Sequence, residues 1–281
     1  MLGCRNESKA KAAKEELDAA VADAKASCEI EILLVDVSDL NSSRKAAENL
    51  SEAVDGLVMN AGGMMGTTAG DIKEEYGVMN TVAANVLGHV VLFDTLVAAG
   101  KLKAGAIYAG SEVARGIPGF VKKPQMETGS IDEFASICDG SFFGENRDVA
   151  STYSMTKYLG TLWMSAMARK HPNLRCVTVS PGQTHGTNLY EDSSPFLKFV
   201  MTKIANPIQA LLGASHSVEV GAKRYVDVLM DEKSEAYKNG ACYASAKGAA
   251  GPMSDQTSFT EDFQNEEFQD HANEALHRFI K

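Results

Sequence analysis

The sequence is poor in the residues that mark metal-binding and disulfide-rich proteins. Its cysteines are odd in number and widely spread, at Cys4, Cys28, Cys138, Cys176 and Cys242. They form neither a disulfide framework nor a metal-ligand spacing. The six histidines are equally scattered, with no pair at ligand spacing. These absences argue against a metal site and favour a reducing compartment, for which we expect the cytoplasm.

Long apolar runs and an excess of basic residues are also absent. No stretch of about 18 consecutive apolar residues occurs, so we expect no transmembrane span. The first nine residues lack the apolar core of a signal peptide. The 37 acidic and 27 basic residues give a net charge of −10. This charge argues against nucleic acid or an anionic membrane as the main partner.

What the chain does contain is a regular alternation of two apolar patterns. Short apolar runs rich in β-branched residues are typical of buried strands, and stretches with apolar residues three and four positions apart are typical of helices. The alternation predicts a three-layer α/β/α fold with a doubly wound parallel sheet. We find no linker or repeat and expect residues 1–281 to form one domain. The predicted strands are 31–37, 55–59, 104–109, 174–180 and 240–245, and the predicted helices are 7–26, 38–53, 75–99, 152–171 and 262–280, with 193–231 mainly helical.

Residues 112–150 interrupt this alternation. They contain Gly, Pro, Asp and Ser with little sustained period, and we expect a long loop with at most one short helix. Loops of this length inside a compact domain are usually functional. We therefore expect this insertion to form a lid or a wall on the substrate side.

Tyr153 and Lys157 lie four positions apart at the start of the predicted helix 152–171. Residues i and i+4 share one face of a helix, so the phenol and the ammonium group can converge on one point. A positive charge beside a tyrosine lowers its pKa, and such a tyrosine can exchange a proton with a substrate oxygen. The same spacing also occurs by chance on surface helices, so the pair alone does not identify a site.

Further polar residues follow the predicted strands, at the edge where parallel sheets bind ligands. Asp36 ends one strand, Asn60-Ala61-Gly62 follows the next, and Ser111 and Pro181-Gly182 follow two others, while Asn85 lies within a helix. Each has an ordinary explanation by itself, as a turn, a strand end or a buried amide. Their occurrence together and in this order is far more specific.

In this set of motifs the chain resembles the short-chain dehydrogenase/reductase family, NAD(P)-dependent oxidoreductases with a Rossmann-like fold. The resemblance rests on Asn-Ala-Gly at 60–62, Gly-Ser at 110–111, Tyr-x-x-x-Lys at 153–157 and Pro-Gly at 181–182, together with the helix asparagine. It extends from residue 1 nearly to the C-terminus. The long insertion and the stretch 240–280 are similar to the retinol-dehydrogenase-like and bacterial branch of the family.

The resemblance implies a role for each catalytic residue. Tyr153 would be the general acid or base at a carbonyl or alcohol oxygen, and Ser111 would hold that oxygen. Lys157 would lower the tyrosine pKa and bind the nicotinamide ribose. Asn85 would position a water molecule that links Lys157 to solvent. The substrate would be a small carbonyl compound or alcohol, with NADP(H) as the hydride carrier.

The resemblance also implies a cofactor-binding set. Asp36 and Val37 would lie at the adenine ring, Asn60, Ala61 and Gly62 at the adenosine and ribose, and Pro181, Gly182 and Thr184 or Thr187 at the nicotinamide side. Arg5 lies where the family distinguishes its cofactors, and neither Gly3 nor Cys4 supplies an acid. Because an arginine pairs with the 2′-phosphate of NADP, NADP is favoured, with NAD left as an alternative.

One part of the family pattern is not found. Nothing before Cys4 matches the first, central strand and the Gly-rich turn that binds the cofactor pyrophosphate. We therefore expect a sheet without that strand, and hypothesise that the sequence is a fragment or an incomplete gene model with uncertain activity.

Two other functions remain open at this stage. One is a non-catalytic binding or regulatory protein on the same fold, which would not require the Asn-Ser-Tyr-Lys set. The other is a sugar-nucleotide epimerase, which usually has a larger substrate domain after the sheet. Homo-oligomers are common in the family, but the sequence does not show one.

Overall fold

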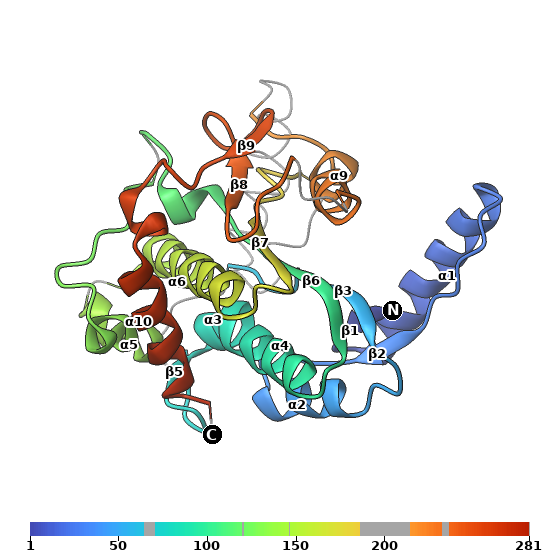
Figure 1. Ribbon diagram of the computed structural model, residues 1–281, viewed down its shortest axis with the longest axis horizontal. Coiled ribbons are helices and arrows are strands. Elements are labelled where there is room, and N and C mark those ends of the chain that lie inside the picture. Colours follow the sequence, from blue (N-terminus) through green and yellow to red (C-terminus); the bar gives the residue numbers. More distant parts are fainter. Residues whose placement is uncertain (65–70, 120, 146, 186–213, 232–235, 281) are drawn as a thin grey trace.

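The computed structural model describes residues 1–64, 71–119, 121–145, 147–185, 214–231 and 236–280 (Figure 1). Its largest sheet has five strands in the order β3–β6–β7–β8–β9. The first four are parallel and the last is antiparallel to its neighbour. Their bounds are β3 Val54–Met59, β6 Leu102–Ala109, β7 Arg175–Val179, β8 Cys242–Ser245 and β9 Met253–Asp255. The predicted α/β fold with a mainly parallel sheet is confirmed.

Two further strands form a separate parallel pair. These are β1 (Leu2–Cys4) and β2 (Ile32–Leu34), in which Gly3 pairs with Leu33. Within the described residues neither strand pairs with β3, so the sheet that the alternation predicted is divided into two. A short antiparallel hairpin joins β4 (Ile72–Lys73) to β5 (Val78–Met79).

Helices cover both faces of the five-stranded sheet. Tyr108 and Ala106 of β6 pack into the core cluster that contains α4 and α6, whereas Ile107 packs with Val228 of α9 on the opposite face. Figure 1 shows α4, α6 and α10 stacked beside one another on one side of the sheet. The described α-helices are α1 Glu7–Asp23, α2 Leu40–Glu48, α3 Asn80–Val82, α4 Gly88–Ala98, α5 Ile131–Asp139, α6 Val149–Lys170, α9 Val218–Leu229 and α10 Glu266–His277. A π-helical turn, η1, covers Ala83–Leu87, and 3₁₀ turns cover η2 Glu112–Arg115, η3 Ser141–Phe143 and η5 Glu261–Gln264.

The centre of the core is the contact between α6, α4 and β6. Asp148 caps the start of α6 by accepting a hydrogen bond from the Ser151 amide at 2.9 Å. From Thr152 to Ala168 every residue of this helix is buried. Trp163 packs edge-to-face against Phe93 of α4, with ring centroids 5.6 Å apart, and against Tyr108. This packing fixes the N-terminal turns of α6 against the end of β6.

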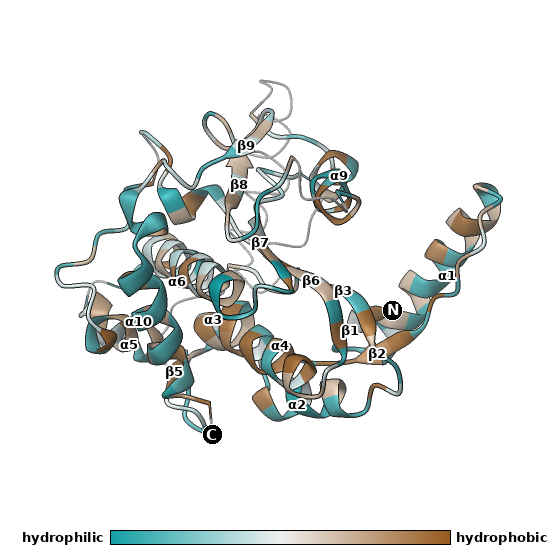
Figure 2. Ribbon diagram, viewed as in Figure 1, coloured by the Kyte–Doolittle hydropathy of each residue, from teal (hydrophilic) through white to brown (hydrophobic). Residues whose placement is uncertain are grey.

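The continuous helix Asn80–Ala98 is long and apolar enough to cross a membrane, but 78% of its most apolar window is buried inside the protein. Figure 2 shows apolar residues along α4 and mainly hydrophilic residues along α10, which lies on the outside of this layer. The apolar character of the helix is explained by its central place in the core.

Several predicted boundaries and burial patterns are wrong. The predicted helix 75–99 begins only at Asn80, because Gly77, at φ +66°, closes the β4–β5 hairpin. The strands at 31–37 and 55–59 were expected to be buried on both faces, yet Leu34 is 51% and Val58 37% exposed. The antiparallel strand β9 was not predicted.

Other predictions agree within a few residues or cannot be compared. The insertion 112–150 contains α5 and two short 3₁₀ turns, as expected for a loop with one short helix. Of the segment 193–231, only the end falls within the described residues, and it forms α9.

Candidate active site

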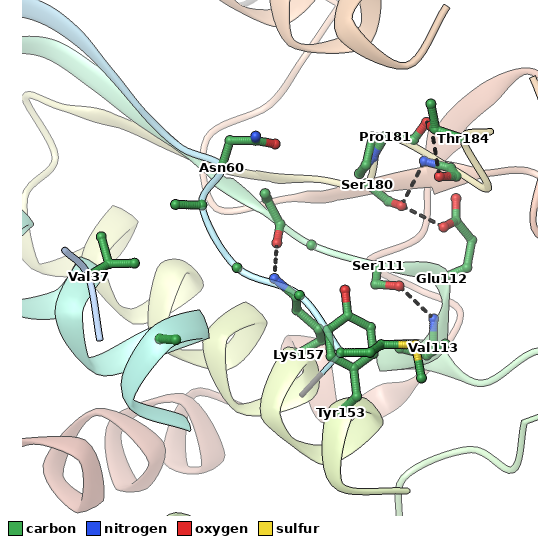
Figure 3. Close-up of a pocket in the computed structure, with 18 of the residues that line it drawn as sticks. Val37, Asn60, Ser111, Glu112, Val113, Tyr153, Lys157, Ser180, Pro181 and Thr184 are labelled. Carbon is green, nitrogen blue, oxygen red and sulfur yellow. Dashed lines mark hydrogen bonds between the residues drawn. The ribbon is translucent and has the colours of Figure 1, made fainter. Parts of the chain in front are cut away.

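A cavity of about 620 Å³ opens at the carboxyl ends of the parallel strands (Figure 3). The strand register brings these ends together: Met59 pairs with Tyr108, and Ala109 pairs with Val179. As a result, the loops after β3, β6 and β7 meet at one edge of the sheet. The cavity is lined by Ser111, Tyr153 and Lys157 and by every predicted cofactor residue, namely Arg5, Asp36, Val37, Asn60, Ala61, Gly62, Pro181, Gly182 and Thr184.

Tyr153 and Lys157 occupy the wall formed by α6. Both side chains are largely buried. The Lys157 ammonium donates a hydrogen bond to the Ala109 carbonyl at 2.9 Å and lies 5.6 Å from the centre of the Tyr153 ring. Burial lowers the pKa of Lys157 from 10.5 to about 7. Its charge can therefore change near neutral pH, directly beside the phenol.

Ser111 lies across from Tyr153 at the end of β6. It caps η2, with its hydroxyl accepting a hydrogen bond from the Val113 amide at 3.5 Å. Figure 3 shows Ser111 beside the Tyr153 ring, with its hydroxyl directed toward the Val113 amide, and Lys157 on the other side of the tyrosine. Two hydroxyl groups that line one cavity can bind a single carbonyl or alcohol oxygen.

Asn85 differs from the other predicted residues because it does not line the cavity. It lies in η1 and its amide holds the loop after β3: Oδ1 accepts from the Gly63 amide at 3.1 Å, and Nδ2 donates to the Gly63 carbonyl at 3.0 Å. Its own backbone carbonyl accepts a hydrogen bond from the Tyr108 hydroxyl at 3.1 Å. These contacts make Asn85 a support of the cavity wall. The water-positioning role stays a prediction.

A second buried side chain, that of His89, also contacts the loop after β3. His89 Nε2 lies 2.7 Å from the Ala61 carbonyl. Burial lowers the pKa of His89 to about 4, so the ring is neutral near pH 7. A Cβ at Gly62, where φ is +148°, would lie 2.4 Å from Asn85 Oδ1. Glycine at this position therefore allows the loop to lie against Asn85.

The loop after β7, which the resemblance assigns to the nicotinamide side, is also fixed by internal contacts. The Thr184 hydroxyl donates to the carbonyls of Pro181 and Gly182, at 3.2 and 3.1 Å. His216 Nε2 lies 2.6 Å from the Pro181 carbonyl, and His185 Nδ1 lies 3.1 Å from the Ser215 hydroxyl. Thr187, the alternative to Thr184, lies outside the described residues.

The donor set fits a dinucleotide cofactor at the described positions. Arg5 contributes a cation to the cavity lining, and Asp36 contributes a carboxylate. Asp36 accepts hydrogen bonds from the amide and hydroxyl of Ser38, at 2.9 and 2.8 Å, which fixes its orientation. Within the described residues, no three His, Cys, Asp or Glu side chains are grouped so as to hold a metal ion.

Several lining residues were not predicted from the sequence. Glu112 and Ser180 lie in the floor of the cavity, and Tyr225 reaches it from α9. Ile117 and Val121, which pair across a tight turn, form an apolar wall. Gly116 and Gly119 indicate a turn in the sequence, but no local pattern shows that Ile117 and Val121 line the same cavity as Ser111.

The comparisons with known proteins support the fold, and this support comes from solved structures alone. No family model matches the chain, and no curated protein matches it. An uncharacterized protein from Mycobacterium paratuberculosis superposes with a TM-score of 0.60 and 18% identity, covering 99% of this chain and 82% of that one.

Two named enzymes are similar to the same degree. The L-sorbose reductase of Gluconobacter frateurii, solved with NADPH and L-sorbose, gives a TM-score of 0.59 at 16% identity, with 88% and 85% of the two chains covered. A short-chain dehydrogenase/reductase of Serratia marcescens gives 0.54 at 19% identity, with 85% and 82% covered. The chain therefore has the Rossmann-like α/β fold of short-chain dehydrogenase/reductase structures.

Proposed function

We propose that the protein is an oxidoreductase that transfers a hydride between NADP(H) and a small carbonyl compound or alcohol. The observation that carries this proposal is the single cavity in which Ser111, Tyr153 and Lys157 lie beside the loops after β1, β2, β3 and β7. Structures of similar fold include the sorbose reductase with NADPH and, at a TM-score of 0.50 and 16% identity, an NADPH-bound carbonyl reductase from chicken fatty liver.

In reduction, the bound dinucleotide would supply a hydride to the carbonyl carbon. The C=O π bond then breaks, and the carbonyl oxygen takes a proton from the Tyr153 hydroxyl. Ser111 would hold that oxygen by a hydrogen bond. The Lys157 ammonium would stabilise the phenolate that remains, because opposite charges attract strongly where water is excluded.

Arg5 supports the choice of NADP over NAD. It lies just after β1 and lines the end of the cavity that contains Asp36. A guanidinium group pairs with phosphate through two parallel hydrogen bonds, and the 2′-phosphate is the group that distinguishes NADP from NAD.

The division of the sheet supports a second part of the proposal. β1 and β3 both present an edge that has no strand partner within the described residues, and Val58 on β3 is exposed. An upstream strand and Gly-rich turn would fill the space between them and bind the pyrophosphate. We propose that the printed sequence is a fragment of a longer enzyme and binds the cofactor weakly. An upstream open reading frame without a Gly-rich segment would exclude this.

The most informative experiment is a substrate screen. The 281-residue chain and its upstream-extended form are each incubated with NADPH or NADH and a panel of aldehydes, ketones and ketoses. Loss of the reduced cofactor is followed by absorbance. We expect turnover with NADPH that is stronger in the extended form. NADPH binding without turnover on any member of the panel would favour the non-catalytic alternative.

A further inference from the structure

A buried ion pair lies next to the predicted catalytic serine, and its acidic member, Glu112, lines the cavity. Glu112 follows Ser111 directly, and Arg224 reaches it from α9. Each is only 4% exposed, and the two charged groups approach to 3.5 Å. Burying two charges costs free energy unless further hydrogen bonds satisfy them. The remaining contacts of the pair therefore need to be accounted for.

The Glu112 carboxylate joins three strand ends. One oxygen accepts a hydrogen bond from the Ser180 hydroxyl at 2.5 Å, after β7. The other accepts from the amide and the hydroxyl of Ser245, at 3.0 and 2.8 Å, at the end of β8. Glu112 itself begins the 3₁₀ turn after β6 that Ser111 caps. A single side chain thus connects the carboxyl ends of β6, β7 and β8.

The contact between Glu112 and Ser180 extends to the Pro181–Gly182 loop, on the side where we propose that the cofactor binds. The Ser180 hydroxyl accepts a hydrogen bond from the Gly182 amide at 3.1 Å while it donates to Glu112. Gly182 has φ +75°, and a Cβ there would lie 2.9 Å from Arg224 Nη1. The glycine backbone is therefore held by the network and packed directly against it.

Arg224 completes the connection. It donates to the Ser180 carbonyl at 2.9 Å, to the Ser245 hydroxyl at 3.1 Å and to the Gly251 carbonyl at 2.7 Å. Arg115, at the other end of η2, donates to the carbonyls of Ser245 and Gly248, at 2.8 and 3.0 Å. The loop after β8 is thereby bound to the same charged cluster.

We propose that Glu112 is a positioning residue, which sets Ser111 and the Pro181–Gly182 loop at a fixed separation across the cavity. The kinetic part of this inference rests on the proposed function. Both oxygens of the Glu112 carboxylate accept hydrogen bonds from the protein itself. Glu112 acts by fixing the backbone on both sides of the place where a carbonyl and a nicotinamide would meet. An error of about 1 Å in such an arrangement can reduce the rate about a hundredfold.

The test uses E112Q, which keeps the size of the side chain and removes its charge. We expect kcat for NADPH-dependent reduction to fall about ten- to a hundredfold, because the hydrogen bonds to a charged acceptor are weakened. Hydrogen exchange, followed by mass spectrometry, should speed up together in peptides covering 111–117, 180–185 and 245–251.

The double variant E112L/R224L separates positioning from general stability. Replacing both partners of a buried ion pair by apolar residues can preserve stability, whereas removing one leaves an uncompensated charge. We expect the double variant to unfold nearer to the wild-type temperature than E112L does, while kcat stays low. Recovery of kcat in parallel with the unfolding temperature would show a purely structural role and overturn the proposal.

Glu133 provides a matched control outside this cavity. Its carboxylate also fixes a loop, by accepting hydrogen bonds from the amides of Glu127, Thr128 and Gly129 at 2.6, 2.8 and 2.7 Å. E133Q should leave kcat and exchange in 180–185 unchanged. Wild-type kcat and exchange in E112Q would refute the positioning role. If the wild-type protein turns over no carbonyl, the proposed function fails, and the exchange pattern of E112Q still decides the positioning claim.

Discussion

Two regions of the molecule differ sharply in how well they are packed. In the layer formed by β6, α4 and α6, one helix is buried over almost its whole length. In the region of β1, β2 and α1, Ala10 is the one fully buried residue of α1, and Figure 1 shows that helix extending away from the rest of the chain. The residues that we propose for proton transfer therefore lie in the well-packed region, whereas Arg5 and Asp36 lie in the sparsely packed one.

The largest expected effect is on the free energy of unfolding. It appears when a substitution in the core is compared with one at an apolar residue of α1. Trp163→Ala should lower the free energy of unfolding by about 3–5 kcal/mol, because the ring is fully buried against Phe93 and Tyr108 and leaves a cavity. Leu17→Ala, at a residue that is 42% exposed, should cost under about 1 kcal/mol. Denaturant unfolding of both variants measures the comparison. Equal losses would show that the two regions are packed alike.

The next effect concerns the pH dependence of stability. In the unfolded chain Lys157 keeps its proton up to about pH 10.4, but burial lowers its pKa to about 7 in the folded protein. Between these values the unfolded state binds more protons, so the free energy of unfolding rises with pH, by up to about 1.4 kcal/mol per pH unit.

Lys157→Met removes this titration. The stability advantage of the variant over the wild-type protein should be greatest at or below pH 7 and shrink as the pH rises toward 10. Denaturant curves at several pH values measure it. Parallel stability profiles of the two proteins would contradict the buried position of this amine.

The smallest effect tests the sparsely packed region. Arg5→Ala should raise the Kd for NADPH about tenfold, because a charge-assisted pair with the 2′-phosphate is lost. The Kd for NADH should stay within about twofold. Cofactor fluorescence measures both. Equal weakening of the two cofactors would remove the support for an NADP preference, and Lys9→Ala on the nearby helix serves as the matched surface control.

The alternation of strands and helices and the residues that line the cavity were predicted well from the sequence. The burial of individual side chains was predicted less well. Asn60, Ser111 and Pro181 could be placed at one edge because parallel strands end at the same side of a sheet. Leu34 and Val58 were expected to be buried because apolar runs are typical of central strands, but burial depends on neighbours that a local pattern does not specify.

The roles of Asn85 and Glu112 show a second limit. Asn85 was predicted to position a water molecule that links Lys157 to solvent, and this role stays a prediction, but its hydrogen bonds to Gly63 were not foreseen. Glu112 was not singled out in the sequence, because its partners Ser180, Arg224 and Ser245 are far from it in sequence. Hydrogen bonds between distant segments are set by the tertiary structure and leave no periodic signal.

The central claim is that Tyr153 exchanges the proton that accompanies hydride transfer. It is tested most directly by comparing wild-type protein and Tyr153→Phe in NADPH-dependent reduction of a carbonyl found in the screen, with the Kd for NADPH measured in both. We predict that kcat falls at least about a hundredfold, since general acid–base catalysis contributes about 10²–10⁴-fold, and that the Kd changes little. A variant that keeps wild-type turnover would contradict the assigned role.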